Sequence, residues 1–112
     1  MMKNLIVVIV LACIAGFSAG SDAVTVKGME KCEAWVRNRA MQPAPSWNSR
    51  VDSAWLTGYL SGVAVARDID FLKGVDDNLI KSWMDNYCRS HPSERVGYAA
   101  DALSVELKNR MR

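Results

Sequence analysis

The amino-acid sequence predicts an all-α protein, namely a small four-helix domain with one disulfide that follows a cleaved signal peptide. An apolar run near the N-terminus is too short to span a membrane. Four later segments repeat apolar residues every three or four positions. Once the leader is removed, two cysteines remain, Cys32 and Cys88. The expected boundaries are 1–23 for the signal peptide and 24–112 for a single helical domain.

The first residues have the three parts of a secretory signal peptide. Lys3 gives a positive start, an apolar run spans 5–17, and small and polar residues follow it. A transmembrane helix needs about 20 apolar residues, and this run is shorter. We therefore expect cleavage after Gly20 or Ala23, a periplasmic or secreted location, and no stable membrane insertion after cleavage.

A bacterial lipoprotein is the minor alternative. The segment 10–13 resembles a lipoprotein box, in which Cys13 would become the lipidated first residue. However, Leu11 is not the favoured residue at its position, and the stretch 14–17 is more apolar than the usual polar tether. Cleavage by the general export route is therefore the preferred interpretation.

The cysteine count predicts one structural disulfide. An even pair of cysteines in an exported chain favours a bond between them, here Cys32 and Cys88. The loop between them is long, and the chain-entropy model assigns its closure about 4 kcal/mol of stabilisation. A small domain has a total stability of about 5–10 kcal/mol, so reduction should loosen or unfold this one.

The first two expected helices differ in composition. The first spans 27–40, with Cys32 on its apolar stripe, and a proline-containing loop over 41–49 follows it. In that loop Trp47 is a weak candidate for partner binding, the alternative being that it folds back onto the core. The second helix spans 51–67 and is apolar most of the way round, which favours a buried central helix.

Two glycines and several aromatic residues are expected to pack these helices together. Gly58 and Gly62 are four residues apart, a spacing that lets another backbone approach closely. The third helix begins after the N-cap Asp76 and ends near Ser90, and the fourth begins at Pro92. The aromatic residues expected to supply most of the core are Trp35, Trp55, Tyr59, Trp83 and Tyr87.

The sequence predicts no catalytic residue, metal or cofactor. Cys88 and His91 are three apart, but a catalytic thiol needs a lowered pKa and an oriented base, and zinc needs about four ligands. The acids of 68–77 lack the alternation and the glycine of a calcium loop. Basic residues are not clustered as they are on a surface that tracks phosphates, so nucleic acid is not an expected partner.

Part of the chain resembles the Rap/Tai family of type VI secretion immunity proteins. The motifs are Gly-Tyr-Leu-Ser-Gly-Val at 58–63, His-Pro-Ser-Glu-Arg at 91–95 and Ala-Ala-Asp-Ala-Leu at 99–103. That resemblance implies a small exported helical protein that binds and blocks a cell-wall amidase. The family places its cysteines elsewhere, at regions occupied here by Thr57, Phe71 and the C-terminal tail, so no inhibitory residue is carried over.

A second resemblance is to the HdeA acid chaperones, exported four-helix proteins with one disulfide between an early and a late helix. Cys32 and Cys88 fit that arrangement, whereas the Gly-Tyr and His-Pro motifs do not. We therefore expect an exported protein-binding module rather than an enzyme. Its partner is a cell-wall-degrading effector or, alternatively, an unfolding client in acid, and a homodimer is left open.

Overall fold

The computed structural model describes residues 24–111, and within them the protein is all-α, as predicted. The predicted signal peptide, its cleavage sites and Cys13 lie outside the described residues. The helices are α2 (Cys32–Ala40), α3 (Trp47–Arg67), α4 (Asp77–Ser90) and α5 (Val96–Arg110).

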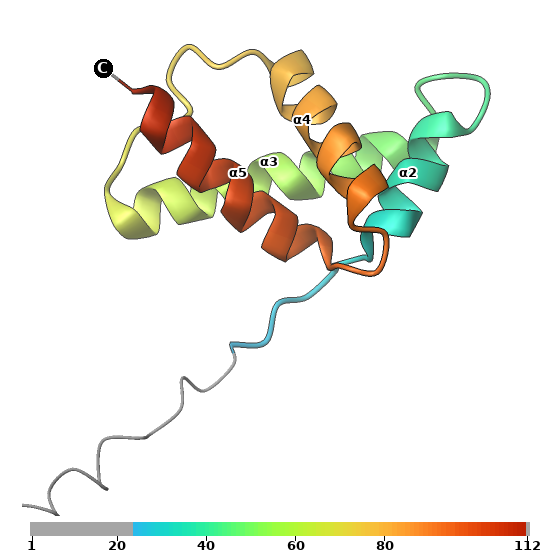
Figure 1. Ribbon diagram of the computed structural model, residues 1–112, viewed down its shortest axis with the longest axis horizontal. Coiled ribbons are helices and arrows are strands. Elements are labelled where there is room, and N and C mark those ends of the chain that lie inside the picture. Colours follow the sequence, from blue (N-terminus) through green and yellow to red (C-terminus); the bar gives the residue numbers. More distant parts are fainter. Residues whose placement is uncertain (1–23, 112) are drawn as a thin grey trace, which may run out of the picture.

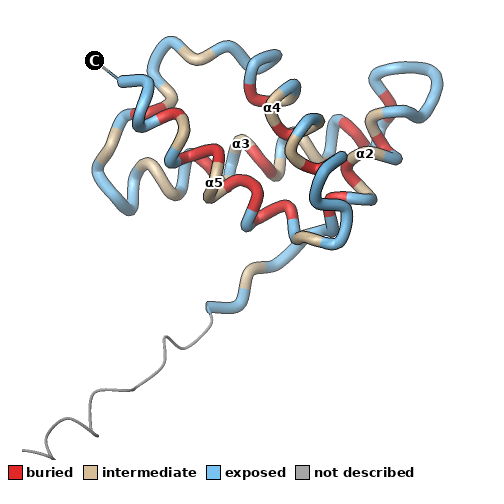
Figure 2. The backbone as a smooth tube through the Cα atoms, in the orientation of Figure 1, coloured by how far each residue is buried: buried red, intermediate tan, exposed pale blue. Residues whose placement is uncertain are grey.

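The four helices pack as two pairs that share a core. α2 packs against α4 at one end of the molecule, while α5 crosses α3 and also contacts α4 (Figure 1). Buried residues follow α5 along most of its length (Figure 2). The buried apolar cluster consists of Cys32, Trp35, Leu56, Leu60, Phe71, Ile80, Met84, Cys88, Val96, Ala99, Ala100, Leu103 and Leu107.

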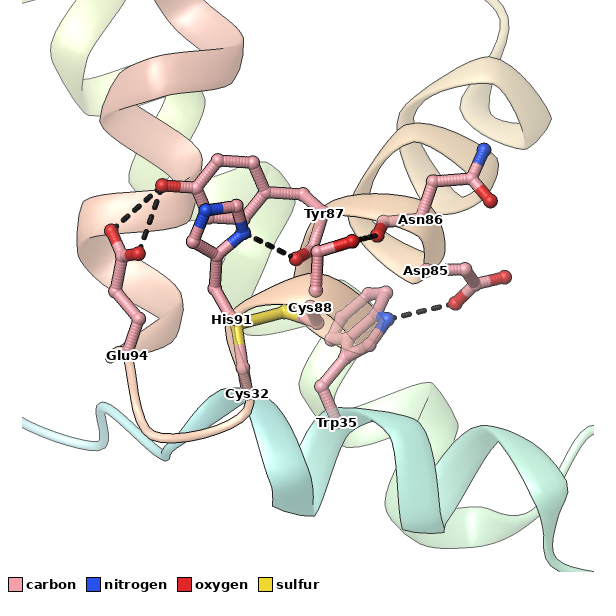
Figure 3. Close-up of a disulfide and its surroundings, with 9 residues drawn as sticks. Cys32, Trp35, Asp85, Asn86, Tyr87, Cys88, His91 and Glu94 are labelled. Atoms are coloured by element: carbon pink, nitrogen blue, oxygen red, sulfur yellow. Dashed lines mark hydrogen bonds between the residues drawn. A yellow bond between two sulfur atoms is a disulfide. The ribbon is translucent and has the colours of Figure 1, made fainter.

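The predicted disulfide between Cys32 and Cys88 is confirmed. It joins the first residue of α2 to the last turn of α4, with the two Cα atoms 4.7 Å apart (Figure 3). Both cysteines are fully buried. The bond therefore fixes a helix of only nine residues, which would be marginal alone, onto a longer neighbour.

The starts of the first and fourth predicted helices are wrong. α2 begins at Cys32 rather than residue 27, and α5 begins at Val96 rather than Pro92. The reason is tertiary: Cys32 N–H donates to Glu94 O at 2.7 Å, and Val96 N–H donates to Glu30 O at 2.8 Å. Each chain segment satisfies the other's backbone groups, so neither extends its helix.

The expected loop over 41–49 ends early, because α3 begins at Trp47. The side chain of Ser46 caps this helix by accepting a hydrogen bond from Ser49 N–H at 3.1 Å, and its hydroxyl donates to Asn38 O at 2.7 Å. Trp47 consequently lies in the first turn of α3 with 76% of its surface exposed, so it does not fold back onto the core.

The prediction that the second helix, α3, is a buried central helix is also wrong. Only Ser49, Leu56 and Leu60 of this helix are buried. No atom of another described element lies within 4 Å of a Cβ placed on Gly58 or Gly62, so the expected close crossing at these glycines does not occur within the described chain. Apolar composition predicts that a face avoids water, but it does not say which element covers it.

The predicted N-cap of the third helix is confirmed, whereas most of the aromatic residues expected in the core are only partly buried. The Asp76 carboxylate accepts a hydrogen bond from Asn78 N–H at 2.7 Å, and α4 follows directly. Of the expected core aromatics only Trp35 is fully buried. The others lie half-buried against the core, namely Trp55, Tyr59, Trp83 and Tyr87.

Candidate protein-binding surface

One side of α3 is apolar and faces outward. We call it the outer face of α3. It is formed by Trp47, Val51, Ala54, Gly58, Gly62 and Val65, all of which are exposed. These residues recur every three or four positions, so they lie on one stripe, opposite Leu56 and Leu60. Val65 is 82% exposed, which is unusual for a side chain that gains free energy from burial.

The outer face carries no formal charge over most of its length. No Asp, Glu, Lys or Arg occurs in the stretch 53–66, between Asp52 and Arg67. Isolated exposed apolar residues are ordinary, but a contiguous exposed apolar patch marks an interaction site. The core contacts of Leu56 and Leu60 hold the helix in place, so the face cannot turn inward without breaking the core.

A hollow of about 400 Å³ adjoins the outer face. It lies between α3 and the segment that precedes α2, and Val26, Lys27, Ala54, Trp55, Gly58 and Tyr59 line it. Trp55 Nε1 donates to Lys27 O at 2.9 Å, which fixes the wall formed by the N-terminal segment. Gly28 adopts a φ of 76°, a conformation suited to glycine, as that segment passes the indole.

The aromatic side chains at the hollow are held in position. The rings of Trp55 and Tyr59 stack with centroids 5.1 Å apart. Tyr59 Oη donates to Asp101 Oδ1 of α5 at 2.8 Å. Burial, followed by the hydrogen bond to Asp101, raises the pKa of Tyr59 to about 12. The edge of the outer face is therefore rigid, which lowers the entropic cost of binding a partner.

The stretch around Cys88 and His91 forms a helix end rather than a reactive pair. The sulfur of Cys88 is bonded to Cys32. The His91 ring stacks on Tyr87 with centroids 4.1 Å apart, and its Nδ1 lies 2.8 Å from Tyr87 O (Figure 3). Tyr87 Oη donates to Glu94, and burial raises the pKa of Tyr87 together with that bond. These contacts turn the chain from α4 toward α5.

A charged junction connects α2 to α4. The Asp85 carboxylate accepts hydrogen bonds from Trp35 Nε1 at 2.8 Å and from Arg39 Nε and Nη2 at 2.9 and 2.8 Å. The hydrogen bond to Asp85 raises the pKa of Arg39. A cavity of about 370 Å³ opens beside the pair and also contacts Arg89. The geometry satisfies the indole N–H of a buried tryptophan, so its main effect is structural.

The acids of 68–77 have local structural roles. Asp68 ends α3 in the left-handed conformation with a φ of 53°, and Asp76 caps α4. Over residues 24–111, His, Cys, Asp and Glu do not gather in groups of three or more that are able to hold a metal ion. Among the helices of the described part, none is both long and apolar enough to cross a membrane.

Comparisons of the chain with models of protein families, with curated proteins and with solved structures each found no match. The argument for function therefore depends on the surface itself. Sequence reasoning proposed Trp47 as a contact residue but missed the rest of the outer face. The available signal was the uncharged stretch 53–66, whose apolar character was interpreted as a sign of a buried central helix.

Proposed function

We propose that this protein is an exported helical module that binds another protein through the outer face of α3. The observation that carries the proposal is a contiguous exposed apolar stripe, from Trp47 to Val65, on a helix that the core holds in place. Aromatic anchors such as Trp47 and Trp55 are enriched at sites that dominate binding energy. A disulfide is compatible with an oxidising location, which supports export.

An incoming cell-wall-degrading enzyme is the proposed partner, with this protein as its immunity-type inhibitor. The resemblance to immunity proteins includes the segment 58–63, which contributes Gly58 and Gly62 to the outer face. In the structure these glycines leave room for a foreign backbone, because apart from the adjoining residues and backbone of α3 itself no described atom lies within 4 Å of a Cβ placed on either. A close backbone approach is what such spacing permits.

An acid-activated holdase is the second candidate, and a specific feature favours it. Several helix contacts depend on a carboxylate: Asp85 joins α4 to α2, and Asp101 joins α5 to α3. The carboxylate of Asp85 forms an ion pair with Arg39 at 2.8 Å. Loss of such contacts in acid would release apolar surface that is able to cover unfolding clients.

A pair of matched variants tests the first candidate. Val51 on the outer face and Val105 on α5 are 49% and 50% exposed, so Val51→Lys and Val105→Lys make the same change at equal exposure. The assay is peptidoglycan hydrolysis by a purified cell-wall amidase of the type that the resembled immunity proteins block. Wild type and Val105→Lys are expected to inhibit it, and Val51→Lys is expected to lose inhibition by more than about tenfold.

Two results would overturn this assignment. Equal inhibition by both variants would place the binding surface elsewhere. Absence of inhibition by wild type, together with suppression of client aggregation below about pH 3 and none at neutral pH, would select the holdase instead.

A further inference from the structure

We propose that the outer face of α3 binds a second copy of this chain, with the two α3 helices antiparallel and crossing at Gly58. This inference rests on the proposed function, because it names what covers the binding surface when the target protein is absent. The charge distribution of the helix, rather than its small residues, distinguishes a second copy from other occupants.

The two ends of the outer face carry opposite charges. Arg50 lies near its start and Asp68 at its end, and both are exposed. An α-helix turns by about 100° per residue, so the Cα atoms of Arg50 and of the C-cap Asp68 both lie about 80° from the direction of Gly58, on the same flank. Between them the helix carries Asp52, which accepts a hydrogen bond from Asn38 of α2, and Arg67, which points toward Ser104 of α5 on the opposite side.

A two-fold axis at Gly58 aligns these charges. Arg50 precedes Gly58 by eight residues and Asp68 follows it by ten, which corresponds to about 12 Å and about 15 Å along the helix. An antiparallel two-fold keeps each flank on the same side of the pair. Arg50 of one copy therefore comes within about 3 Å, measured along the axis, of Asp68 of the other. The two-fold repeats this contact, which makes the face self-complementary.

The rest of the face fits the same arrangement. The two-fold places Val51 opposite Val65 and Ala54 opposite Gly62, so small residues lie near the crossing and larger apolar ones toward the ends. Antiparallel helices also bring opposite macrodipole ends together. Because no atom of another described element lies within 4 Å of a Cβ at Gly58 or Gly62, the second backbone has room to approach.

The size of the face predicts a weak dimer. A helix of 21 residues is about 31 Å long and about 10 Å wide, so its footprint is about 300 Å². Stable complexes bury about 800 Å² on each partner. The self-association should therefore lie in the micromolar range or weaker, and a target protein with a larger contact can displace the second copy.

The experiment measures self-association by sedimentation, with protein produced from the full coding sequence and recovered after its natural processing. Wild type is expected to pass from monomer to dimer between about 1 µM and about 1 mM. Arg50→Glu and Asp68→Lys should each weaken dimerisation about tenfold or more. An equimolar mixture of the two variants should dimerise again, since both contacts then pair opposite charges. Arg89→Glu, on α4, is the matched control and should behave as wild type.

One further variant, Gly58→Glu, and a folding check complete the test. Asp68→Lys strains a left-handed position, so its folding is checked by circular dichroism; if it unfolds, Arg50→Glu and Gly58→Glu decide alone. Gly58→Glu has free space and should fold, and it should remain monomeric. A monomeric wild type, an Arg50→Glu variant that dimerises as wild type does, or a mixture of folded variants that stays monomeric would each overturn the inference.

The two proposals fail in different ways. A monomeric wild type whose inhibition of the amidase is lost in Val51→Lys would remove the dimer and leave the proposed function intact. A dimer that responds to the charge reversals, without any inhibition of the amidase, would support the self-association and remove the proposed role as an inhibitor.

Discussion

Reduction of the disulfide between Cys32 and Cys88 should remove a large part of the protein's stability. The bond closes a loop with a sequence separation of 56 residues, and the chain-entropy model gives about 4 kcal/mol for a loop of that length. Small domains have total stabilities of about 5–10 kcal/mol. The reduced protein should therefore be marginal, and α2 should be the first element to detach, because it has only nine residues.

Urea denaturation followed by tryptophan fluorescence measures this loss directly. The buried Trp35 on α2 reports detachment of that helix. With a urea m-value of about 1.3 kcal/mol/M, a loss of 4 kcal/mol moves the midpoint by about 3 M. The control is the variant Cys32→Ala/Cys88→Ala, whose midpoint should not respond to the reductant. A shift of less than about 0.5 M on reduction would refute the reasoning, since it would leave most of the predicted stabilisation unaccounted for.

Three other perturbations test contacts of the core and of the outer face. Gly28→Ala places a methyl group 3.0 Å from Trp55 Nε1 at a φ of 76°, and urea denaturation should show a loss of stability of about 1–2 kcal/mol. The control is Gly74→Ala, at a φ of 71° but with open space, which should lose only the stability that the backbone strain costs. Asp85→Ala leaves Trp35 Nε1 without its acceptor and Arg39 without its partner, so the same assay should show a loss of stability of about 2–3 kcal/mol. An unchanged urea midpoint would contradict this expectation. Tyr59 should ionise near pH 12 by tyrosinate absorbance; because its folded pKa is raised above 10.0, its contribution to stability is present below pH 10 and is lost as the pH rises toward 12. Asp101→Asn should lower that pKa, and no change would show that the hydrogen bond does not contribute.

The sequence predicted the helices well where local signals determine them. Asp76 was recognised as an N-cap because an acidic side chain precedes a periodic apolar stripe, and α4 begins at the next residue. The pairing of Cys32 with Cys88 followed from counting the two cysteines that remain after the predicted leader. Both inferences use information within a few residues or simple arithmetic, so the sequence alone is sufficient for them.

The errors occur where a distant segment competes for the backbone or where coverage of a face decides burial. Helical periodicity suggested that residues 27–31 belong to the first helix, yet the groups at 30–33 bond to the segment 92–96 instead. Neither segment contains a sequence pattern that predicts this pairing. The apolar run of α3 likewise suggested a buried helix, but composition does not show which elements cover it, and only Ser49, Leu56 and Leu60 of this helix are buried. The outer face was therefore visible only in three dimensions.

The neighbouring carboxyl groups of Glu30 and Asp52 provide a test that distinguishes the two candidate functions. Burial, and then the charge of Asp52, raise the pKa of Glu30 above 4.5. A raised folded pKa gives a contribution to stability that is full below about pH 4.5 and is lost as the pH rises through the folded value. Mild acid should therefore stabilise this site, which opposes the acid loosening that a holdase requires.

Asp52→Asn removes the repulsion and keeps a carbonyl oxygen that is able to accept the hydrogen bond from Asn38 Nδ2. The variant should be more stable than wild type at neutral pH and nearly equal to it near pH 4, as measured by thermal unfolding across that range. Asp70→Asn, at an exposed position, is the control and should not change the pH dependence. If wild type nevertheless unfolds steadily as the pH falls from neutral, contacts such as Arg39 with Asp85 contribute more to the pH dependence of stability than Glu30 and Asp52 do. The holdase then becomes the better explanation of the fold.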